Sequence, residues 1–185
     1  MAAISDLRNR IDKLQGMVTQ IYIATCHPAE TLDNSIGIPT LPVISMEDFC
    51  VWEDFILQEE KKLIMIRQLI EHCTENLKGS IYCIMRKLMT NKVAVNFNLK
   101  GTNREGARYG KKKFQSTTSY ILVIAIVKKH AQERIDRGLQ FTYNREIADL
   151  HITNWLKDAK KRLENELLRL RKSGQQDEQE ENETA

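Results

Sequence analysis

The sequence contains no segment that is long and apolar enough to predict a membrane-spanning helix. Its longest apolar run, residues 120–127 (YILVIAIV), has eight residues, whereas a spanning helix needs about 20. The first ten residues, MAAISDLRNR, have no apolar signal-peptide core, and the acidic Asp6 argues against a mitochondrial presequence. These absences predict a protein of the cytosol or the nucleus.

Cysteine is scarce and unpaired, and this pattern excludes the usual metal and disulfide motifs. Zinc sites use spacings such as CxxC or HxxxH, which let two side chains reach one ion, whereas here two cysteines stand directly beside a histidine. We therefore predict no metal site, and we expect free thiols that pack as small hydrophobes in a reducing compartment. The four cysteines are Cys26, Cys50, Cys73 and Cys83.

Signatures of catalysis and of nucleotide binding are also missing. The sequence has no GxSxG or HExxH motif. Gly101 and Gly106 have the spacing of a nucleotide-binding P-loop, but Ala and Arg follow where that motif requires Lys and Ser or Thr. A pair of Cys73 with His130 or His151 is conceivable, although nothing in the sequence places them together. We predict no enzymatic activity and no cofactor.

Proline and glycine are few, with 3 and 8 among 185 residues, so long regular elements are permitted. A hydrophobic content of 42% and a charged content of 29% are normal for a helix-rich globular protein. The length suits one domain with a core, plus extensions. We therefore expect a mainly α fold, a compact helical bundle with an N-terminal coiled-coil-like helix.

The pattern of apolar residues divides the chain into four parts. Residues 1–26 predict an amphipathic helix, and residues 27–44, which hold all three prolines, predict a linker. Residues 45–173 predict the helical domain, and residues 174–185 are too polar and acidic to bury a core, so we expect a disordered tail.

Within the predicted domain, several residues mark the ends of helices. Ser45 to Asp48 resembles a capping box, and Asn144 predicts the start of a long helix that ends near Ser173. Between them, an apolar helix at 119–137 is expected to lie in the core, and Gly138 to end it. Residues 93–99 alternate as in a strand, but a short helix or an extended turn fits as well. Trp52 and Trp155 are expected to anchor the core.

The first part of the chain has the spacing of a coiled-coil seam. Apolar residues recur at alternating intervals of three and four, with β-branched residues at a and mainly leucine at d, a pattern typical of parallel dimers. Fewer than three heptads are marginal on their own. Dimerisation and packing of an amphipathic helix on its own domain therefore both stay open. The seam consists of Ile4, Leu7, Ile11, Leu14, Val18 and Ile21.

The net charge of +3 conceals an asymmetry along the chain. No basic residue follows Lys172, and the five acidic residues between 177 and 183 leave 28 basic against 20 acidic residues, or +8, for the rest. A basic body with an acidic tail is typical of a protein that binds a polyanion while its tail competes for the same surface. The alternative is a tail that only increases solubility.

Basic side chains gather around three glycines in residues 96–114 (NFNLKGTNREGARYGKKKF). They precede a predicted helix start at 116–118, where free N–H groups and the helix dipole would favour an anion. Nucleic-acid phosphate is such an anion, whereas the alternative is a solvated lysine run. The residues expected to contact phosphate are Lys100, Arg104, Arg108, Lys111, Lys112 and Lys113 in this stretch, and Arg86 and Lys87 on the preceding helix.

Three stretches together resemble an uncharacterised family, domain of unknown function 4806. They are residues 84–101 (IMRKLMTNKVAVNFNLKG), 110–114 (GKKKF) and 155–162 (WLKDAKKR), and an extended Leu41-Pro42 segment precedes them. The likeness covers about residues 41–163. Family members often carry Trp where this chain has Leu99, and the loop from Gly101 to Gly110 is longer than the family's turn.

The layout is also similar, more distantly, to that of BEN domains, which are helical modules associated with DNA and chromatin. The two resemblances imply a nuclear module that binds DNA or chromatin without catalysis, and the heptad spacing adds the N-terminal helix as its dimerisation element. This implication rests on analogy of fold. The alternative is a protein-interaction or oligomerisation adaptor, nuclear or cytoplasmic, whose basic residues are merely exposed.

Overall fold

The computed structural model describes residues 37–101 and 110–183, with side chains as far as residue 171. The chain divides into two units, Met1–Ile38 and Pro39–Ala185, and the described helices and strands all belong to the second. The predicted N-terminal seam, from Ile4 to Ile21, lies outside the described residues, and so do Arg104 and Arg108. No helix in the described part is long and apolar enough to cross a membrane.

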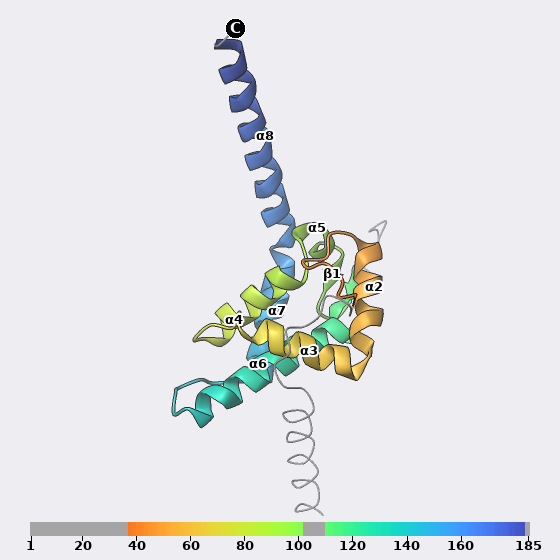
Figure 1. Ribbon diagram of the computed structural model, residues 1–185, viewed down its shortest axis with the longest axis vertical. Coiled ribbons are helices and arrows are strands. Elements are labelled where there is room, and N and C mark those ends of the chain that lie inside the picture. Colours follow the sequence, from red (N-terminus) through yellow and green to blue (C-terminus); the bar gives the residue numbers. More distant parts are fainter. Residues whose placement is uncertain (1–36, 102–109, 184–185) are drawn as a thin grey trace, which may run out of the picture. The chain divides into compact units, whose positions relative to one another are not determined.

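The second unit is mainly helical, as predicted (Figure 1). Its described residues form seven α-helices, one short 3₁₀ helix and two strands of two residues each. In chain order they are α2 (Met46–Leu57), α3 (Glu59–Ile70), α4 (Leu77–Leu88), α5 (Asn91–Ala94), β1 (Phe97–Asn98), β2 (Lys112–Lys113), η2 (Phe114–Ser116), α6 (Thr118–Asp136), α7 (Arg145–Lys157) and α8 (Ala159–Glu183).

The helix ends follow local capping chemistry, and several of them are where the sequence predicted them. The Ser45 hydroxyl accepts a hydrogen bond from the Asp48 N–H at 3.0 Å and donates one to the Asp48 carboxylate. The Asn144 side chain accepts from the Ile147 N–H at the start of α7. After α6, Gly138 adopts a φ of 72°, a left-handed conformation that glycine takes at little cost.

Other boundaries differ from those expected. The predicted helix from Asn144 is interrupted at Asp158, which separates α7 from α8. α8 then runs through Glu183, so residues 174–183 are helical where disorder was expected. At the other end, the Val43 N–H donates to the Leu88 carbonyl and the Val43 carbonyl accepts from Thr90. Residues of the predicted linker therefore belong to the domain.

Residues 93–99, for which the sequence was compatible with either a strand or a short helix, include parts of both. α5 occupies residues 91–94, and β1 follows it and pairs in parallel with β2, with Phe97 opposite Lys112 and Asn98 opposite Lys113. This two-stranded pairing connects residues on either side of the segment 102–109. It thereby sets the position of the lysines at both ends of that segment.

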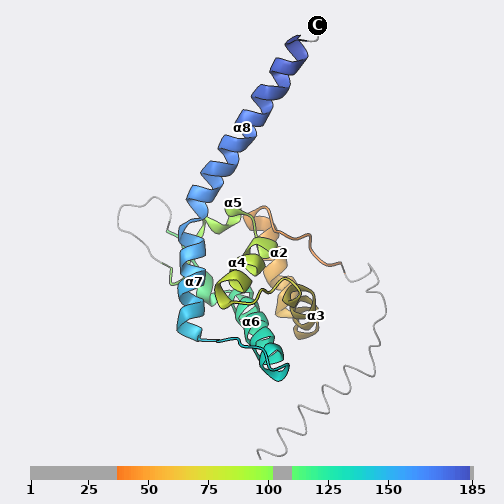
Figure 2. The same cartoon turned by 90° about the vertical axis from the view of Figure 1, so that its left-hand side faces the viewer.

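The core is built around α6, which contacts α2, α3 and α4, while α4 also contacts α7 (Figure 2). Both tryptophans are buried as predicted, Trp52 with none of its surface exposed and Trp155 with 1%. A row of aromatic rings leads from α2 to α6 through β1 and η2. Its successive ring centres lie 4.9 to 6.1 Å apart, in the order Phe49, Phe97, Phe114 and Tyr120.

Candidate nucleic-acid interface

The pairing of β1 with β2 brings together the two ends of the basic loop. The Lys112 N–H donates to the Asn96 carbonyl at 2.8 Å, and the Gln115 N–H donates to the Leu99 carbonyl at 3.0 Å. Gly101 has a φ of 69°, and a Cβ atom there would lie 2.9 Å from the Cβ of Lys113. Glycine is therefore required at this position, because both the backbone conformation and the close approach exclude a side chain.

This arrangement gathers four predicted phosphate contacts. The side chains of four lysines are exposed: Lys100, Lys111, Lys112 and Lys113. Because Gly101 lies against Lys113, its neighbour Lys100 is close to Lys113. Leu99, which stands where members of the resembled family often carry Trp, is buried. Its side chain therefore contributes to the core and leaves the exposed surface to the lysines.

Arg86 and Lys87 are exposed in the last turn of α4. A further cation, Arg162, lies near Arg86, and the sequence analysis did not include it among the site residues. Burial lowers the pKa of Arg162 from its ordinary value, Asp158 opposes this shift, and the positive charge of Arg86 adds to it. Arg86 and Arg162 are thus close enough for their charges to interact.

Arg162 is held in place by three contacts. Its Nε donates to the Asn91 side-chain oxygen at 2.8 Å, and its Nη1 donates to the Trp155 carbonyl at 2.8 Å. Its guanidinium carbon also lies 4.2 Å from the centre of the Trp155 ring, a cation–π contact. Arg162 therefore fixes the start of α8 against α5 and α7, and these contacts direct its guanidinium into the domain.

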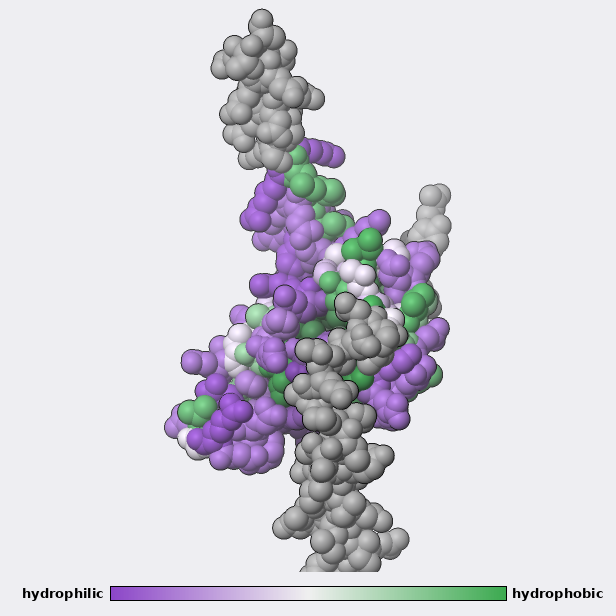
Figure 3. Space-filling view, viewed as in Figure 1, coloured by the Kyte–Doolittle hydropathy of each residue, from purple (hydrophilic) through white to green (hydrophobic). Residues whose placement is uncertain are grey.

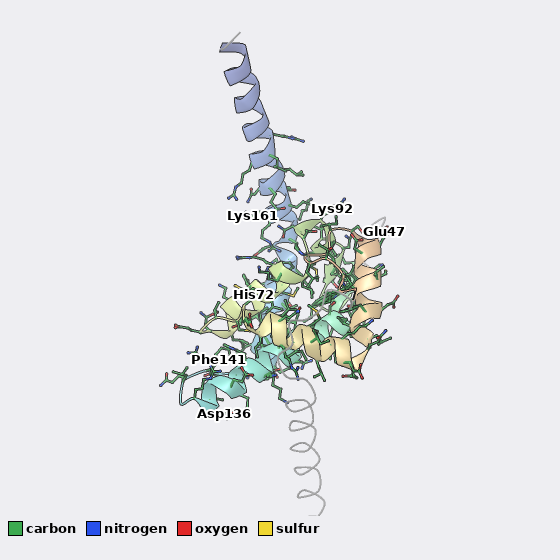
Figure 4. All side chains as sticks on the ribbon, viewed as in Figure 1. Glu47, His72, Lys92, Asp136, Phe141 and Lys161 are labelled. Carbon is green, nitrogen blue, oxygen red and sulfur yellow. The ribbon has the colours of Figure 1, made fainter. Side chains whose placement is uncertain are left out.

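α5 connects the two groups of basic residues. Asn91 at its start contacts Arg162, and its last turn leads to Asn96, whose carbonyl accepts from Lys112. Between Asn91 and Asn96 only residues 91–94 are helical, and they rise about 5 Å at 1.5 Å per residue. The exposed Lys92 lies between them, and its carbonyl accepts from the Asn96 side chain. Figure 4 shows Lys92 and Lys161 at the same end of the domain.

We call this surface the basic strip. Sequence reasoning missed Lys92 as a member, although the residue lies inside the quoted stretch 84–101 and beside an asparagine that could have indicated an exposed turn. None of the ion pairs among the described residues includes a side chain of the strip. Its members are Arg86, Lys87, Lys92, Lys100, Lys111, Lys112 and Lys113.

Arg145, at the start of α7, differs from the strip residues because it has an acidic partner. Its Nη2 donates to the Tyr120 hydroxyl at 2.8 Å, and that hydroxyl donates to the Asp149 carboxylate at 2.6 Å. Arg145 also lies 3.5 Å from Asp149. Because the carboxylate offsets its charge, Arg145 is left out of the strip.

The N-terminus of α6 does bind an anion, but that anion belongs to the protein. The Thr118 N–H donates to Oε2 of Glu53 at 2.7 Å, and the Ser119 N–H donates to Oε1 at 2.9 Å. The next N–H, of Tyr120, donates to the Thr117 hydroxyl. The prediction that this helix start holds a phosphate therefore needs correction, because its first three N–H groups are already used.

Cys73 and His130, a pair considered for catalysis, each have another partner: the Cys73 thiol hydrogen-bonds with the Ser80 side chain, and the His130 ring lies against the Phe141 ring. Burial raises the pKa of the Cys73 thiol to about 12, so the thiol stays protonated at neutral pH. The Nε2 atom of His130 lies 3.0 Å from the carbonyl of Thr74, the neighbour of Cys73 in sequence. Among the described residues, no three His, Cys, Asp or Glu side chains gather as a metal site would require.

Comparison of the chain with protein-family models, with curated proteins and with solved structures gives no match. The resemblance to the domain of unknown function 4806 family, and the more distant one to BEN domains, therefore stay predictions. The function is inferred from the geometry of the domain itself.

Proposed function

We propose that this domain binds nucleic acid through the phosphate backbone, as a non-enzymatic DNA- or chromatin-associated module. The observation that carries the proposal is the β1–β2 pairing, which sets Lys100 beside Lys111, Lys112 and Lys113 at the base of one loop. Four exposed ammonium groups without a carboxylate partner in the described residues favour a polyanion. Lys92, Arg86 and Lys87 extend the same surface across α5.

The number of these charges suits a row of phosphates. One DNA strand presents a phosphate about every 3.4 Å along the axis, and the strip has seven exposed basic side chains. The strip can therefore face several phosphates at once. Contacts of this kind position a protein on nucleic acid without reading its sequence, so we propose binding with little sequence preference. Nuclear localisation is part of this proposal.

The two arginines of the basic loop would strengthen this binding. Arg104 and Arg108, between Gly101 and Gly110, would add phosphate contacts to those of the lysines.

The test is fluorescence anisotropy of a labelled duplex of about 20 base pairs with three forms of the full chain. In the first variant, Lys111, Lys112 and Lys113 are all replaced by Gln. In the matched control, Lys128, Lys129 and Arg137 are replaced by Gln, which removes the same charge. Of these three exposed residues, Lys128 and Lys129 lie in the second half of α6 and Arg137 directly follows the helix, and Asp136 beside Arg137 is remote from Lys92 in Figure 4.

We expect the strip variant to lose at least tenfold in affinity and the control to stay within about threefold of the wild-type chain. Equal losses in the two variants would mean that only net charge matters and that the strip is no site. Absence of binding by the wild-type chain at low salt would remove the proposal and leave the adaptor alternative. The observation that favours that alternative is the row of exposed leucines on α8.

A further inference from the structure

α8 carries an apolar stripe on the part that follows its contacts with α5. Leu163 is half-buried at the base of the stripe, whereas Leu167 and Leu168 are 48% and 53% exposed. Leu163, Leu167 and Leu170 recur at intervals of four and three, the spacing of a coiled-coil seam. The space-filling view shows hydrophobic residues along this side of α8 (Figure 3). Large exposed leucines in register on one helix face indicate an interaction surface.

The charges of α8 differ between its first and last parts: residues 160–172 include six basic and two acidic residues, and residues 177–183 include five acidic ones. Lys160 and Lys161 are exposed at its start, and the acidic residues from Asp177 to Glu183 follow the leucines. The helix is continuous between the two blocks. From residue 160 to residue 177 it rises about 26 Å at 1.5 Å per residue. One helix thus carries a mainly basic first part, which includes the leucines, and an acidic end.

We propose that α8 pairs with α8 of a second copy of this chain, in antiparallel orientation. If Leu167 of one copy packs against Leu170 of the other, Lys160 falls opposite residue 177 of the partner helix. This register places each basic end beside the other copy's acidic end. A parallel pair would set lysine against lysine and acid against acid, and flanking charges of this kind decide orientation in coiled coils.

A second copy fits this surface better than the N-terminal segment of the same chain. Residues 1–26 also carry apolar residues at heptad spacing, but their charges are mixed: Asp6 and Asp12 stand among Arg8, Arg10 and Lys13. They offer no acidic block to complement Lys160 and Lys161. The acidic residues of α8 itself supply that block. Two copies of α8 in antiparallel orientation are therefore complementary in charge.

The test measures the mass of the full chain by light scattering after size exclusion, over a range of concentrations. We expect the wild-type chain to move towards twice its monomer mass of 21.5 kDa as concentration rises. Leu167→Glu should return it to the monomer mass. Leu139→Glu is the matched control, because this leucine is similarly exposed, at 46%, but follows α6, and it should leave the dimer intact. Circular dichroism checks that both variants remain folded.

Charge exchange tests the orientation. Lys160 and Lys161 are replaced by Glu in one variant, and Asp177 and Glu178 by Lys in another. Each should weaken dimerisation at least tenfold, because like charges then meet at both ends of the antiparallel pair. The chain that carries all four changes should dimerise again, since opposite charges meet once more.

Three results would overturn the proposal. In the first, the wild-type chain stays monomeric at all concentrations. In the second, the dimer persists in the Leu167→Glu variant. In the third, the variant with all four charge changes does not dimerise. The second result would point to the N-terminal seam instead. The proposal does not rest on nucleic-acid binding, because every measurement is made without nucleic acid.

Discussion

Glu53 on α2 caps the first turn of α6 through Ser119, which lies 66 residues later in the chain. The Ser119 N–H donates to Oε1 of Glu53 at 2.9 Å, and the Ser119 hydroxyl donates to the same oxygen. The indole N–H of Trp52 in turn donates to that hydroxyl at 3.0 Å. A carboxylate at this place satisfies helix N–H groups and lies favourably in the helix dipole. The Glu53 carboxylate thus joins α2 to α6, and it occupies the place at the N-terminus of α6 where an external anion would bind.

Glu53→Ala should therefore destabilise the fold. The change leaves the Thr118 and Ser119 N–H groups without their acceptor and removes hydrogen bonds to a charged group, which is expected to cost about 1.5–3 kcal/mol. Glu53→Gln retains one acceptor oxygen and should cost less. The measurement is the free energy of unfolding from urea titration.

Asp54→Asn is the matched control for this prediction, because Asp54 is an exposed acid next to Glu53 on the same helix. Its effect should stay within about 0.5 kcal/mol. If Glu53→Ala and Asp54→Asn shift the urea midpoint equally, the cap contributes nothing beyond surface charge.

Gly101→Ala should disturb the base of the basic loop. A left-handed conformation costs a residue with a side chain about 1–2 kcal/mol, and the new methyl group would also lie 2.9 Å from the Lys113 Cβ. Gly138→Ala separates these two costs, because Gly138 has nearly the same φ but no atom within 4 Å of a Cβ. Urea titration should show the larger loss for Gly101→Ala, and equal losses would refute the close approach.

Arg162→Lys should loosen the start of α8. Lysine keeps the charge but loses the planar group that contacts the Asn91 side chain and the Trp155 carbonyl together. The expected cost is about 1–3 kcal/mol, with faster hydrogen exchange of the α8 amides. Lys161→Gln, at the exposed neighbouring position, serves as the control. Unchanged exchange in Arg162→Lys would show that the contacts do not hold α8.

Cys73 should react slowly with thiol reagents, since only the thiolate is nucleophilic and burial raises the pKa of this thiol to about 12. Alkylation of the folded chain by iodoacetamide at pH 8, followed by peptide mass spectrometry, should modify the exposed Cys50 well before Cys73. Its rate at Cys73 should rise as pH approaches the raised pKa. Labelling of Cys73 as fast as Cys50 would show that the thiol is accessible and ionised.

The features that sequence predicted correctly are governed by residues close in the chain. Ser45 and Asn144 cap helices through an N–H three residues away, and Gly138 ends α6 by its own backbone preference. The core positions of Trp52 and Trp155 follow from apolar periodicity, which reports which face of a helix is buried.

The features that sequence reasoning missed depend on residues far apart in the chain. Glu53 looks like one more acid on an exposed helix, and only the packing of α2 on α6 reveals that it occupies the supposed phosphate position. The contact between Arg162 and Asn91 spans 71 residues, so no local pattern could link Arg86 with the lysines across α5. The spacing of apolar residues also continues across Asp158, so the sequence predicted one helix where the structure has two, α7 and α8.

The central proposal, contact between the basic strip and nucleic-acid phosphates, is tested most directly by the salt dependence of duplex binding. For each phosphate contact, the logarithm of affinity falls with the logarithm of salt concentration by a slope of about 0.9. The Lys111, Lys112 and Lys113 triple Gln variant should therefore show a slope shallower by about 2–3 than the wild-type chain. The Lys128, Lys129 and Arg137 triple control should keep the wild-type slope, and a strip variant with an unchanged slope would contradict the proposal.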